Sequence, residues 1–389
     1  MTSDLEHLVG ASRLPAVGTT IFTVMSALAA KTGAINLGQG FPDFDCDPAL
    51  VDAVAAAMRA GHNQYPPMTG VPALRQAASD KVAMTTGHRY DPDTEITITA
   101  GATQGILSTV LALVHPGDDV IVLEPCYDSY GPSITLAGGN TIRVPLTPGT
   151  WRPDLALLQK SLTARTRLVI VNTPHNPSGT VWTADELARF AALLAPTRAL
   201  VLSDEVYEHM VFDGVAHASV SGLPELAARS VVVSSFGKTF HVTGWKVGYV
   251  AAPAPLMREF RKVHQFNVFT VNAPMQHGIA AFLADPSHWQ SLASFYQAKR
   301  DRFRAGLATT PLKLLPCEGT YFQCVEYSAL SDKTDLAFCE WLATEVGVAA
   351  IPMSAFYDRA PDMRVIRFCF AKKEATLDEA LRRLQALKA

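Results

Sequence analysis

The sequence predicts an α/β protein in which a large domain, built on a mostly parallel, doubly wound seven-stranded sheet, carries a smaller α+β domain. Three observations support this. The middle of the chain alternates short β-branched runs with longer helical patterns, as doubly wound sheets do. Most of these runs are continuously apolar, which is typical of strands buried on both faces. After about Pro286 the pattern changes, and a long polar helix precedes further short strands.

Taken in order, seven runs are the expected strands of the large domain. Helical patterns lie between several of them, including 104–114 and 183–194. The second helix opens with Thr183 and has Glu186 three residues later, the spacing of a capping box. The expected strands are Ile96–Thr99, Val120–Glu124, Ile142–Pro145, Leu168–Asn172, Leu200–Ser203, Val231–Ser235 and Val247–Ala251.

The remaining elements belong to the smaller domain. A helix is expected over Gln290–Leu307, followed by strands at Thr320–Tyr327, Val348–Pro352 and Val365–Ala371. We therefore expect a large domain over residues 46–285. The small domain is then built from both chain ends, 1–45 and 286–389.

Composition excludes several classes of protein. Hydrophobic residues make up 48% and charged residues 18% of the 389 residues, which is typical of globular chains rather than disordered ones. The net charge of −3 gives no indication of nucleic acid or an anionic membrane as a partner. The six cysteines form no CxxC pair and the histidines lack metal-ligand spacing, so no metal is expected. Met1–Ala11 has no apolar core segment and no run is long enough to span a bilayer, so we expect a cytoplasmic protein.

Unusual residues follow four of the expected strands, at the ends where open α/β sheets bind ligands. Gly101-Ala102-Thr103-Gln104-Gly105 opens a helix and could bind an anion, although such glycines also serve tight packing. Asn176 precedes the second of two proline turns, where an Asx-turn would explain it equally well.

The other two strand ends carry charge. Asp204 ends an apolar strand, so it is either a solvated carboxylate or a buried one that requires a cation from the protein or a ligand. Lys238 follows a buried strand by a tight turn. It is either a lysine that reaches solvent or a nucleophile with a lowered pKa.

Taken together, these motifs resemble the fold-type-I, class I aminotransferases that depend on pyridoxal phosphate. The resemblance runs from Asn36 to Arg367 and implies an aspartate aminotransferase-like fold. It is strongest for bacterial methionine aminotransferases, followed by kynurenine and glutamine aminotransferases. The matching motifs are Asn176-Pro177, Asp204-x-x-Tyr207, Ser235-x-x-Lys238 and Lys246-x-Gly248, together with Arg367.

The resemblance implies a role for each residue around the cofactor. Lys238 would hold pyridoxal phosphate as an internal aldimine and then move the substrate α-proton, while Asp204 would pair with the pyridine nitrogen. Tyr207 and Asn176 would hydrogen-bond the phenolic oxygen, and Tyr127 would stack on the ring. The residues expected to hold the phosphate are Gly101, Ala102, Thr103, Gln104, Ser235, Lys246 and, from the neighbouring subunit of a homodimer, Tyr65.

The resemblance also implies how the amino acid binds. Arg367 would clamp the α-carboxylate, with Gly40 letting the backbone approach it and Asn176 nearby. No motif identifies a second arginine for a side-chain carboxylate. An apolar wall suits methionine or aromatic donors, with a 2-oxo acid as acceptor. The residues expected to form that wall are Phe22, Tyr65, Tyr127, Phe266 and Phe269.

Three other functions stay open at this point. A β-lyase acting on cystathionine or cysteine S-conjugates could use the same residues, and so could a kynurenine–oxoglutarate aminotransferase. A non-catalytic sensor domain of a transcriptional regulator would need a winged-helix module before the fold, which starts by about Ile21. Lys246 departs from the arginine that many relatives carry, but a lysine still supplies a charge for the phosphate.

Overall fold

The computed structural model describes residues 10–388. The stretch Met1–Ala11, in which the sequence predicts no signal peptide, lies almost entirely outside this range. None of the helices between residues 10 and 388 is long and apolar enough to cross a membrane.

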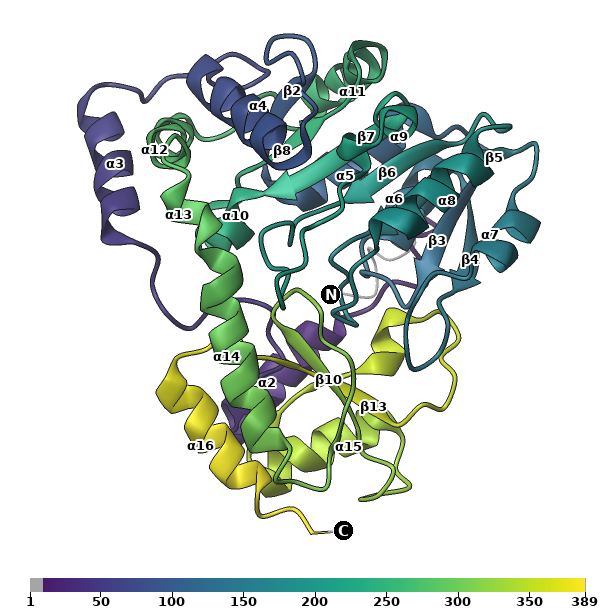
Figure 1. Ribbon diagram of the computed structural model, residues 1–389, viewed down its shortest axis with the longest axis vertical. Helices are drawn as coiled ribbons and strands as arrows, with labels where there is room; N and C mark the ends of the chain where they lie inside the picture. Colours follow the sequence, from purple (N-terminus) through teal and green to yellow (C-terminus); the bar gives the residue numbers. More distant parts are fainter. Residues whose placement is uncertain (1–9, 389) are drawn as a thin grey trace.

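A seven-stranded sheet forms the upper part of the molecule (Figure 1), with the order β2-β8-β7-β6-β5-β3-β4. β8 is antiparallel to both of its neighbours, and the other neighbouring pairs are parallel. The predicted α/β class with a mostly parallel sheet is therefore confirmed. The strands are β2 (Ile96–Thr99), β3 (Asp119–Glu124), β4 (Asn140–Pro145), β5 (Thr166–Asn172), β6 (Leu200–Asp204), β7 (Ser230–Ser235) and β8 (Gly248–Ala251).

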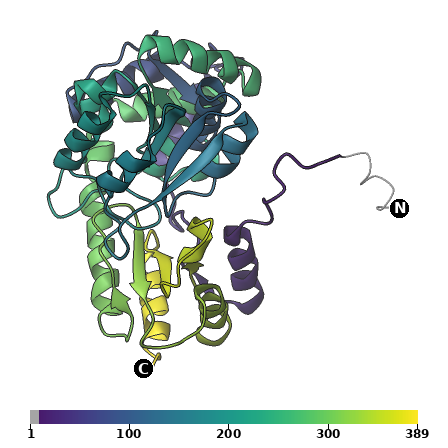
Figure 2. The ribbon, with the colours of Figure 1, turned by 90° about the vertical axis from the view of Figure 1, so that its right-hand side faces the viewer.

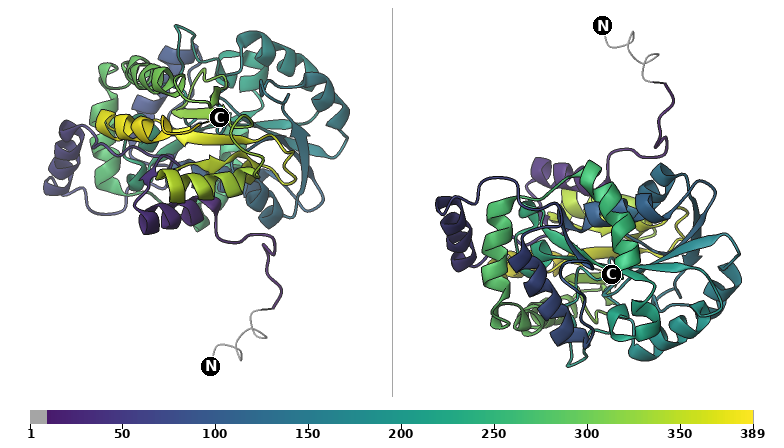
Figure 3. Two further views of the ribbon diagram at one scale, coloured as in Figure 1. Left: turned by 90° about the horizontal axis from the view of Figure 1, so that it is seen from below. Right: turned by 90° about the horizontal axis from the view of Figure 1, so that it is seen from above.

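The central strands are apolar throughout because both of their faces are buried. In β5, Leu168 and Ile170 pack into one hydrophobic cluster, whereas Val169 and Val171 pack into the other. Figure 3 shows helices on both sides of the strands. The helices of this part of the sequence are α3 (Pro48–Arg59), α4 (Pro72–Thr86), α5 (Gly101–Leu113), α6 (Tyr130–Ala137), α7 (Leu155–Ser161), α8 (Ala184–Leu194), α9 (Pro224–Ala227), α10 (Phe236–Thr239), α11 (Ala254–Asn267) and α12 (Ala273–Leu283). Of these, α3 packs on α12 rather than on the sheet.

Two further sheets lie in the lower part of the molecule (Figure 2). One is antiparallel with the order β12-β13-β10-β9, and the other pairs β1 with β11 in parallel. β1 lies ahead of the large sheet in the sequence, so the chain enters this lower part before the large sheet begins. The elements are α2 (Ile21–Thr32), β1 (Ile35–Asn36), α13 (Ser287–Gln290), α14 (Leu292–Leu307), β9 (Lys313–Leu314), β10 (Phe322–Glu326), α15 (Asp335–Trp341), β11 (Val348–Ala349), β12 (Ile351–Pro352), β13 (Val365–Cys369) and α16 (Glu374–Leu384).

The structure differs from the sequence expectation at two of these elements. The single strand expected over 348–352 is two short strands, because the chain leaves one sheet at Ala350 and enters another. The helix expected over 290–307 is interrupted at Ser291, which ends α13 and precedes α14.

Candidate active site

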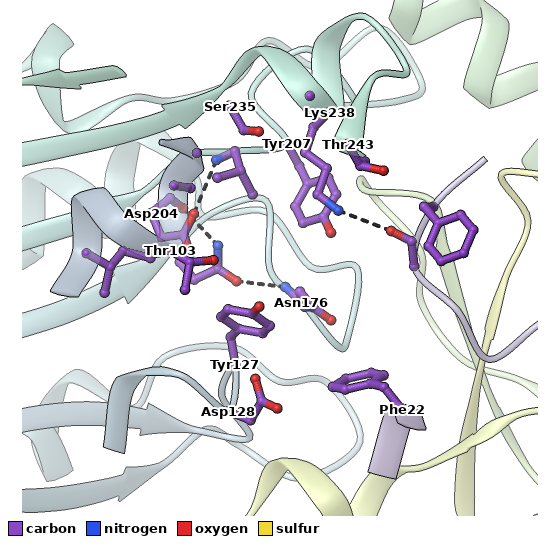
Figure 4. A pocket seen from close by; sticks show the side chains of 18 of the residues that line it. Phe22, Thr103, Tyr127, Asp128, Asn176, Asp204, Tyr207, Ser235, Lys238 and Thr243 are labelled. Atoms are coloured by element: carbon purple, nitrogen blue, oxygen red, sulfur yellow. Dashed lines mark hydrogen bonds between the residues drawn. The ribbon is translucent and has the colours of Figure 1, made fainter. Parts of the chain in front are cut away.

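A cavity of about 360 Å³ opens at the carboxyl ends of the parallel strands, where the start of α5 meets the ends of β5, β6 and β7 (Figure 4). The start of α2, the segment that follows β1, and the strands β10 and β13 close it from the lower part of the molecule. Of the predicted site residues, those that line this cavity are Phe22, Gly40, Gly101, Ala102, Thr103, Tyr127, Asn176, Asp204, Tyr207, Ser235, Lys238, Lys246 and Arg367.

Lys238 lies in α10, a single helical turn directly after β7. Gly237 permits this turn, because a Cβ there would lie 3.1 Å from the Thr243 Cα. The Lys238 Nζ points into the cavity and donates hydrogen bonds to the Tyr321 hydroxyl oxygen (2.7 Å) and to the Gly40 carbonyl (3.1 Å). Burial lowers the pKa of Lys238 to about 8. A sizeable fraction of this amine is therefore neutral near pH 7–8 and able to act as a nucleophile or base.

Asp204 ends β6 and is buried. The Tyr130 hydroxyl donates to one carboxylate oxygen (2.7 Å) and the Val206 amide to the other (3.3 Å). Burial raises the pKa of Asp204 to about 6, and no cation of the described chain forms an ion pair with it. The cationic partner that the sequence requires for a buried carboxylate at this position is therefore not supplied by residues 10–388.

Two carboxylates close to Asp204 in the sequence do have basic partners. Glu205 lies 2.8 Å from the His217 Nε2, and Glu208 forms a buried ion pair with Lys81. The Asp204 carboxylate lines the cavity instead. The arrangement suits a ligand that brings its own positive charge.

The start of α5 provides an anion site beside these residues. Gly101 has a φ of +74°, and a Cβ on it would lie 3.3 Å from the Lys246 Nζ, so the lysine amine lies against the first turn of the helix. Ser235 lines the same end of the cavity. Helix N-terminal amides, a hydroxyl and an ammonium group together match a phosphate.

Gln104, which the resemblance implies as a phosphate-binding residue, does not line the cavity. Its Oε1 accepts from the Ala100 amide (2.9 Å), while its Nε2 donates to Ser108 (2.8 Å) and lies 3.1 Å from the His264 Nδ1. The side chain thus connects the start of α5 to His264 of α11.

Arg367, on β13, is buried without a carboxylate partner among residues 10–388. One terminal nitrogen donates to the Asn176 Oδ1 (2.6 Å) and the other to the Gly38 carbonyl (3.2 Å), while the Nε has no partner. Three aromatic rings surround the guanidinium, at centroid distances of 3.8, 4.9 and 5.5 Å: Phe322, Phe356 and Phe22. A buried, unpaired fork of this kind is suited to a carboxylate.

Tyr207 and Tyr127 line the same cavity as Asp204. Burial raises the pKa of both phenols, so each keeps its proton and can donate a hydrogen bond. The Asn176 Oδ1 accepts from Arg367 and its backbone amide donates to the Asn172 Oδ1, but its side-chain nitrogen, Nδ2, makes no hydrogen bond within residues 10–388. That nitrogen is free to donate to a ligand.

Several residues of the site are missing from the sequence prediction. Tyr130 and Tyr321 contact Asp204 and Lys238, and neither stands in a motif that points to its partner. Asp128 also lines the cavity. It directly follows Tyr127, and that position is the one signal that could have indicated it.

Besides Gln104, three predicted residues lie outside the cavity of this single chain. Tyr65 is 82% exposed and Phe266 is 87% exposed. Phe269 packs against Tyr65 at a ring-centroid distance of 5.4 Å. The described residues also contain no cluster of side chains able to hold a metal ion.

Comparisons with known proteins agree with this geometry. The family model "Aminotransferase class I and II" matches residues 32–384. The methionine aminotransferase of Escherichia coli is 51% identical over 98% of this chain and 99% of its own length. A solved Escherichia coli structure described with a methionine aminotransferase function has a TM-score of 0.95 at 51% identity, covering 97% of this chain and 99% of its own. A probable N-succinyldiaminopimelate aminotransferase of Mycobacterium tuberculosis is 42% identical over 97% of this chain and 98% of its own, and mouse kynurenine–oxoglutarate transaminase 3 is 34% identical over 95% and 88%.

Proposed function

Because the chain belongs to the class I and II aminotransferase family, we propose that it transfers the amino group of methionine or an aromatic amino acid to a 2-oxo acid, using pyridoxal phosphate bound in the cavity described above. The observation that carries the proposal is the buried Asp204 carboxylate. It has no protein cation and shares one cavity with a lysine whose pKa is lowered to about 8. The methionine and kynurenine specificities named for similar proteins support the choice of substrate.

The residues of the cavity fit pyridoxal phosphate. Asp204 would hold the protonated ring nitrogen, which supplies the cation that its burial requires. The start of α5, with Ser235 and Lys246, would hold the phosphate, while Tyr207 and the free amide of Asn176 would donate to the phenolic oxygen. When bound, the cofactor supplies an electron sink that makes the substrate α-proton acidic.

Arg367 and Lys238 would then act on the amino acid. Arg367 binds the α-carboxylate bidentately and so fixes the orientation of the α-carbon. The neutral Lys238 Nζ would take the proton from that carbon and hold it as an ammonium group. The Tyr321 hydroxyl oxygen and the Gly40 carbonyl accept hydrogen bonds from the Nζ and would keep it in the cavity. The surrounding aromatic rings exclude water from this proton transfer.

We also propose a homodimer in which Tyr65 reaches the cofactor phosphate of the neighbouring subunit. Its 82% exposure in the single chain leaves the side chain available for that role. Phe266 and Phe269 would complete the apolar wall from the same face.

An amino-donor panel with several 2-oxo acids tests the proposal, read by product identification. Methionine, phenylalanine, tyrosine and kynurenine should be better donors than aspartate, and the keto acid should form in stoichiometric amounts. A β-lyase would instead release pyruvate, ammonia and a thiol from a cysteine conjugate. A kcat/KM for aspartate equal to or above that for methionine would overturn the substrate assignment.

Phe22→Ala tests the apolar wall separately. An unbranched thioether or an aromatic ring gains on the order of 1–3 kcal/mol from contact with apolar side chains. The variant should therefore lower kcat/KM for methionine and phenylalanine by more than it does for alanine, whose side chain is too short to gain from that wall. An equal loss of kcat/KM for all three donors would show that Phe22 does not contact the substrate side chain.

A further inference from the structure

The charged side chains that line the cavity are five: Asp128, Asp204, Lys238, Lys246 and Arg367. Under the proposed function, four of them serve groups that are common to every substrate. Asp204 faces the ring nitrogen, Lys246 the phosphate and Arg367 the α-carboxylate, while Lys238 is the reacting amine. No cation lining the cavity remains for a substrate side chain.

The fifth charged residue is Asp128, which directly follows the ring-stacking Tyr127. Its carboxylate forms no ion pair and no side-chain hydrogen bond with another residue of the described chain. Burial raises its pKa, and Arg367 is the one cation close enough to oppose that shift. Figure 4 shows the side chain in the cavity, near Tyr127 and on the same side as Phe22. Once Arg367 binds the α-carboxylate, no other cation that lines the cavity is left to offset Asp128, so a substrate side chain that packs on Phe22 lies close to a negative charge.

We propose that Asp128 is a specificity-determining residue that excludes a second carboxylate from the substrate, in the amino donor and in the 2-oxo acid acceptor alike. The inference rests on the proposed function and deepens it. A pocket that merely lacked a second arginine would leave a side-chain carboxylate unpaired, whereas this pocket also repels it. The nitrogen acceptor is then a 2-oxo acid with a single carboxylate, and the donor is an uncharged amino acid.

The inference separates the specificities named for two similar proteins. Methionine carries no charge on its side chain, whereas N-succinyldiaminopimelate carries carboxylates beyond the one that Arg367 would bind. Asp128 therefore favours methionine over N-succinyldiaminopimelate as the amino donor of this chain.

The experiment compares wild-type enzyme with Asp128→Asn, which keeps the size of the side chain and removes its charge. We measure kcat/KM for methionine and glutamate as donors, and for 2-oxoglutarate and a 2-oxo monocarboxylate as acceptors. Two ratios of kcat/KM should each rise about tenfold: glutamate over methionine as donor, and 2-oxoglutarate over the monocarboxylic acid as acceptor. This is the order expected for removal of one like charge in a partly buried site. Asp128→Glu should keep both ratios low, because it keeps the charge.

Glu225→Gln is the matched control, since it removes one negative charge from an exposed position on α9, outside the cavity. It should leave both ratios unchanged. Ratios in Asp128→Asn within twofold of wild type, with methionine still transaminated, would overturn the role of Asp128 and leave the proposed function standing. If the wild-type enzyme did not transaminate methionine, the proposed function itself would be overturned.

Discussion

At the scale of single residues, Asp204 is a buried carboxylate without a basic side chain against it. Its neighbours Glu205 and Glu208 each have a basic side chain against them, while Asp204 has a phenol and an amide. The protein therefore pays a desolvation cost at this carboxylate until a cationic ligand binds.

This cost predicts a pH dependence for the cofactor-free protein. The pKa of Asp204 is about 6 in the folded state, against 3.8 ordinarily, so the folded state holds the proton more tightly than the unfolded one. Wild-type stability should fall as pH rises from about 4 to about 6, by up to about 3 kcal/mol relative to Asp204→Asn. Urea unfolding of both proteins across that range measures the free energy of unfolding at each pH. If this free energy changed with pH equally in wild type and Asp204→Asn, the prediction would be contradicted.

Asp204→Asn has a second consequence in the loaded enzyme. A neutral amide cannot stabilise a protonated ring nitrogen, so kcat should fall by orders of magnitude while KM changes less. Steady-state kinetics with methionine measure both constants. A variant with near-normal kcat would show that Asp204 does not face that nitrogen.

The sequence could predict the residues that stand in motifs, such as Lys238 and Arg367, because their types and spacing are tied to one chemistry. It could not predict Tyr130 or Tyr321, which lie 74 and 83 residues away in the sequence from the side chains that they contact. A tyrosine in an apolar run has the same pattern whether its hydroxyl contacts a catalytic group or an ordinary carbonyl.

At the scale of elements, the large sheet was predictable because burial of both faces leaves a continuous apolar run in the sequence. The capping box at Thr183 and Glu186 was predictable because it is local, and the structure confirms both of its hydrogen bonds. The two-residue strands β11 and β12 are too short to leave a period, and their assignment to different sheets depends on tertiary pairing.

The turn from β6 that presents Asp204 and Tyr207 is anchored by a buried ion pair between Glu208 and Lys81 of α4. Ser234 also donates to the Glu208 carboxylate. Burial alone would raise the pKa of Glu208, yet Lys81 holds it at about 2. The pair thus connects α4, β7 and the turn that forms one wall of the site.

Lys81→Met should therefore destabilise the protein by about 3–5 kcal/mol, because it leaves a buried carboxylate unpaired. The double variant Lys81→Met with Glu208→Gln should recover much of that loss. Urea denaturation measures all three proteins. Lys262→Met is the control, since it removes one partner of the exposed pair with Glu259 and should cost less than about 1 kcal/mol. A single variant as stable as wild type would show that the pair does not hold the turn.

At the scale of the whole molecule, each active site of the proposed dimer needs residues from two subunits. A hybrid of Lys238→Ala and Tyr65→Ala subunits has one site with both defects and one with neither. Each homodimer should be nearly inactive, while the co-expressed hybrid, purified through two different tags, should regain roughly half of the wild-type activity. A hybrid no more active than its parents would place Tyr65 outside the neighbouring site.

The most direct test of the central assignment is reduction of the purified enzyme, which should be yellow, with borohydride, followed by peptide mass spectrometry. The cofactor should be fixed to Lys238, whose buried amine has a pKa near 8 and faces the same cavity as Asp204. Lys238→Ala should still bind the cofactor noncovalently but lose turnover by orders of magnitude. Label on Lys246 or Lys262 in place of Lys238, or full turnover in Lys238→Ala, would contradict the assignment.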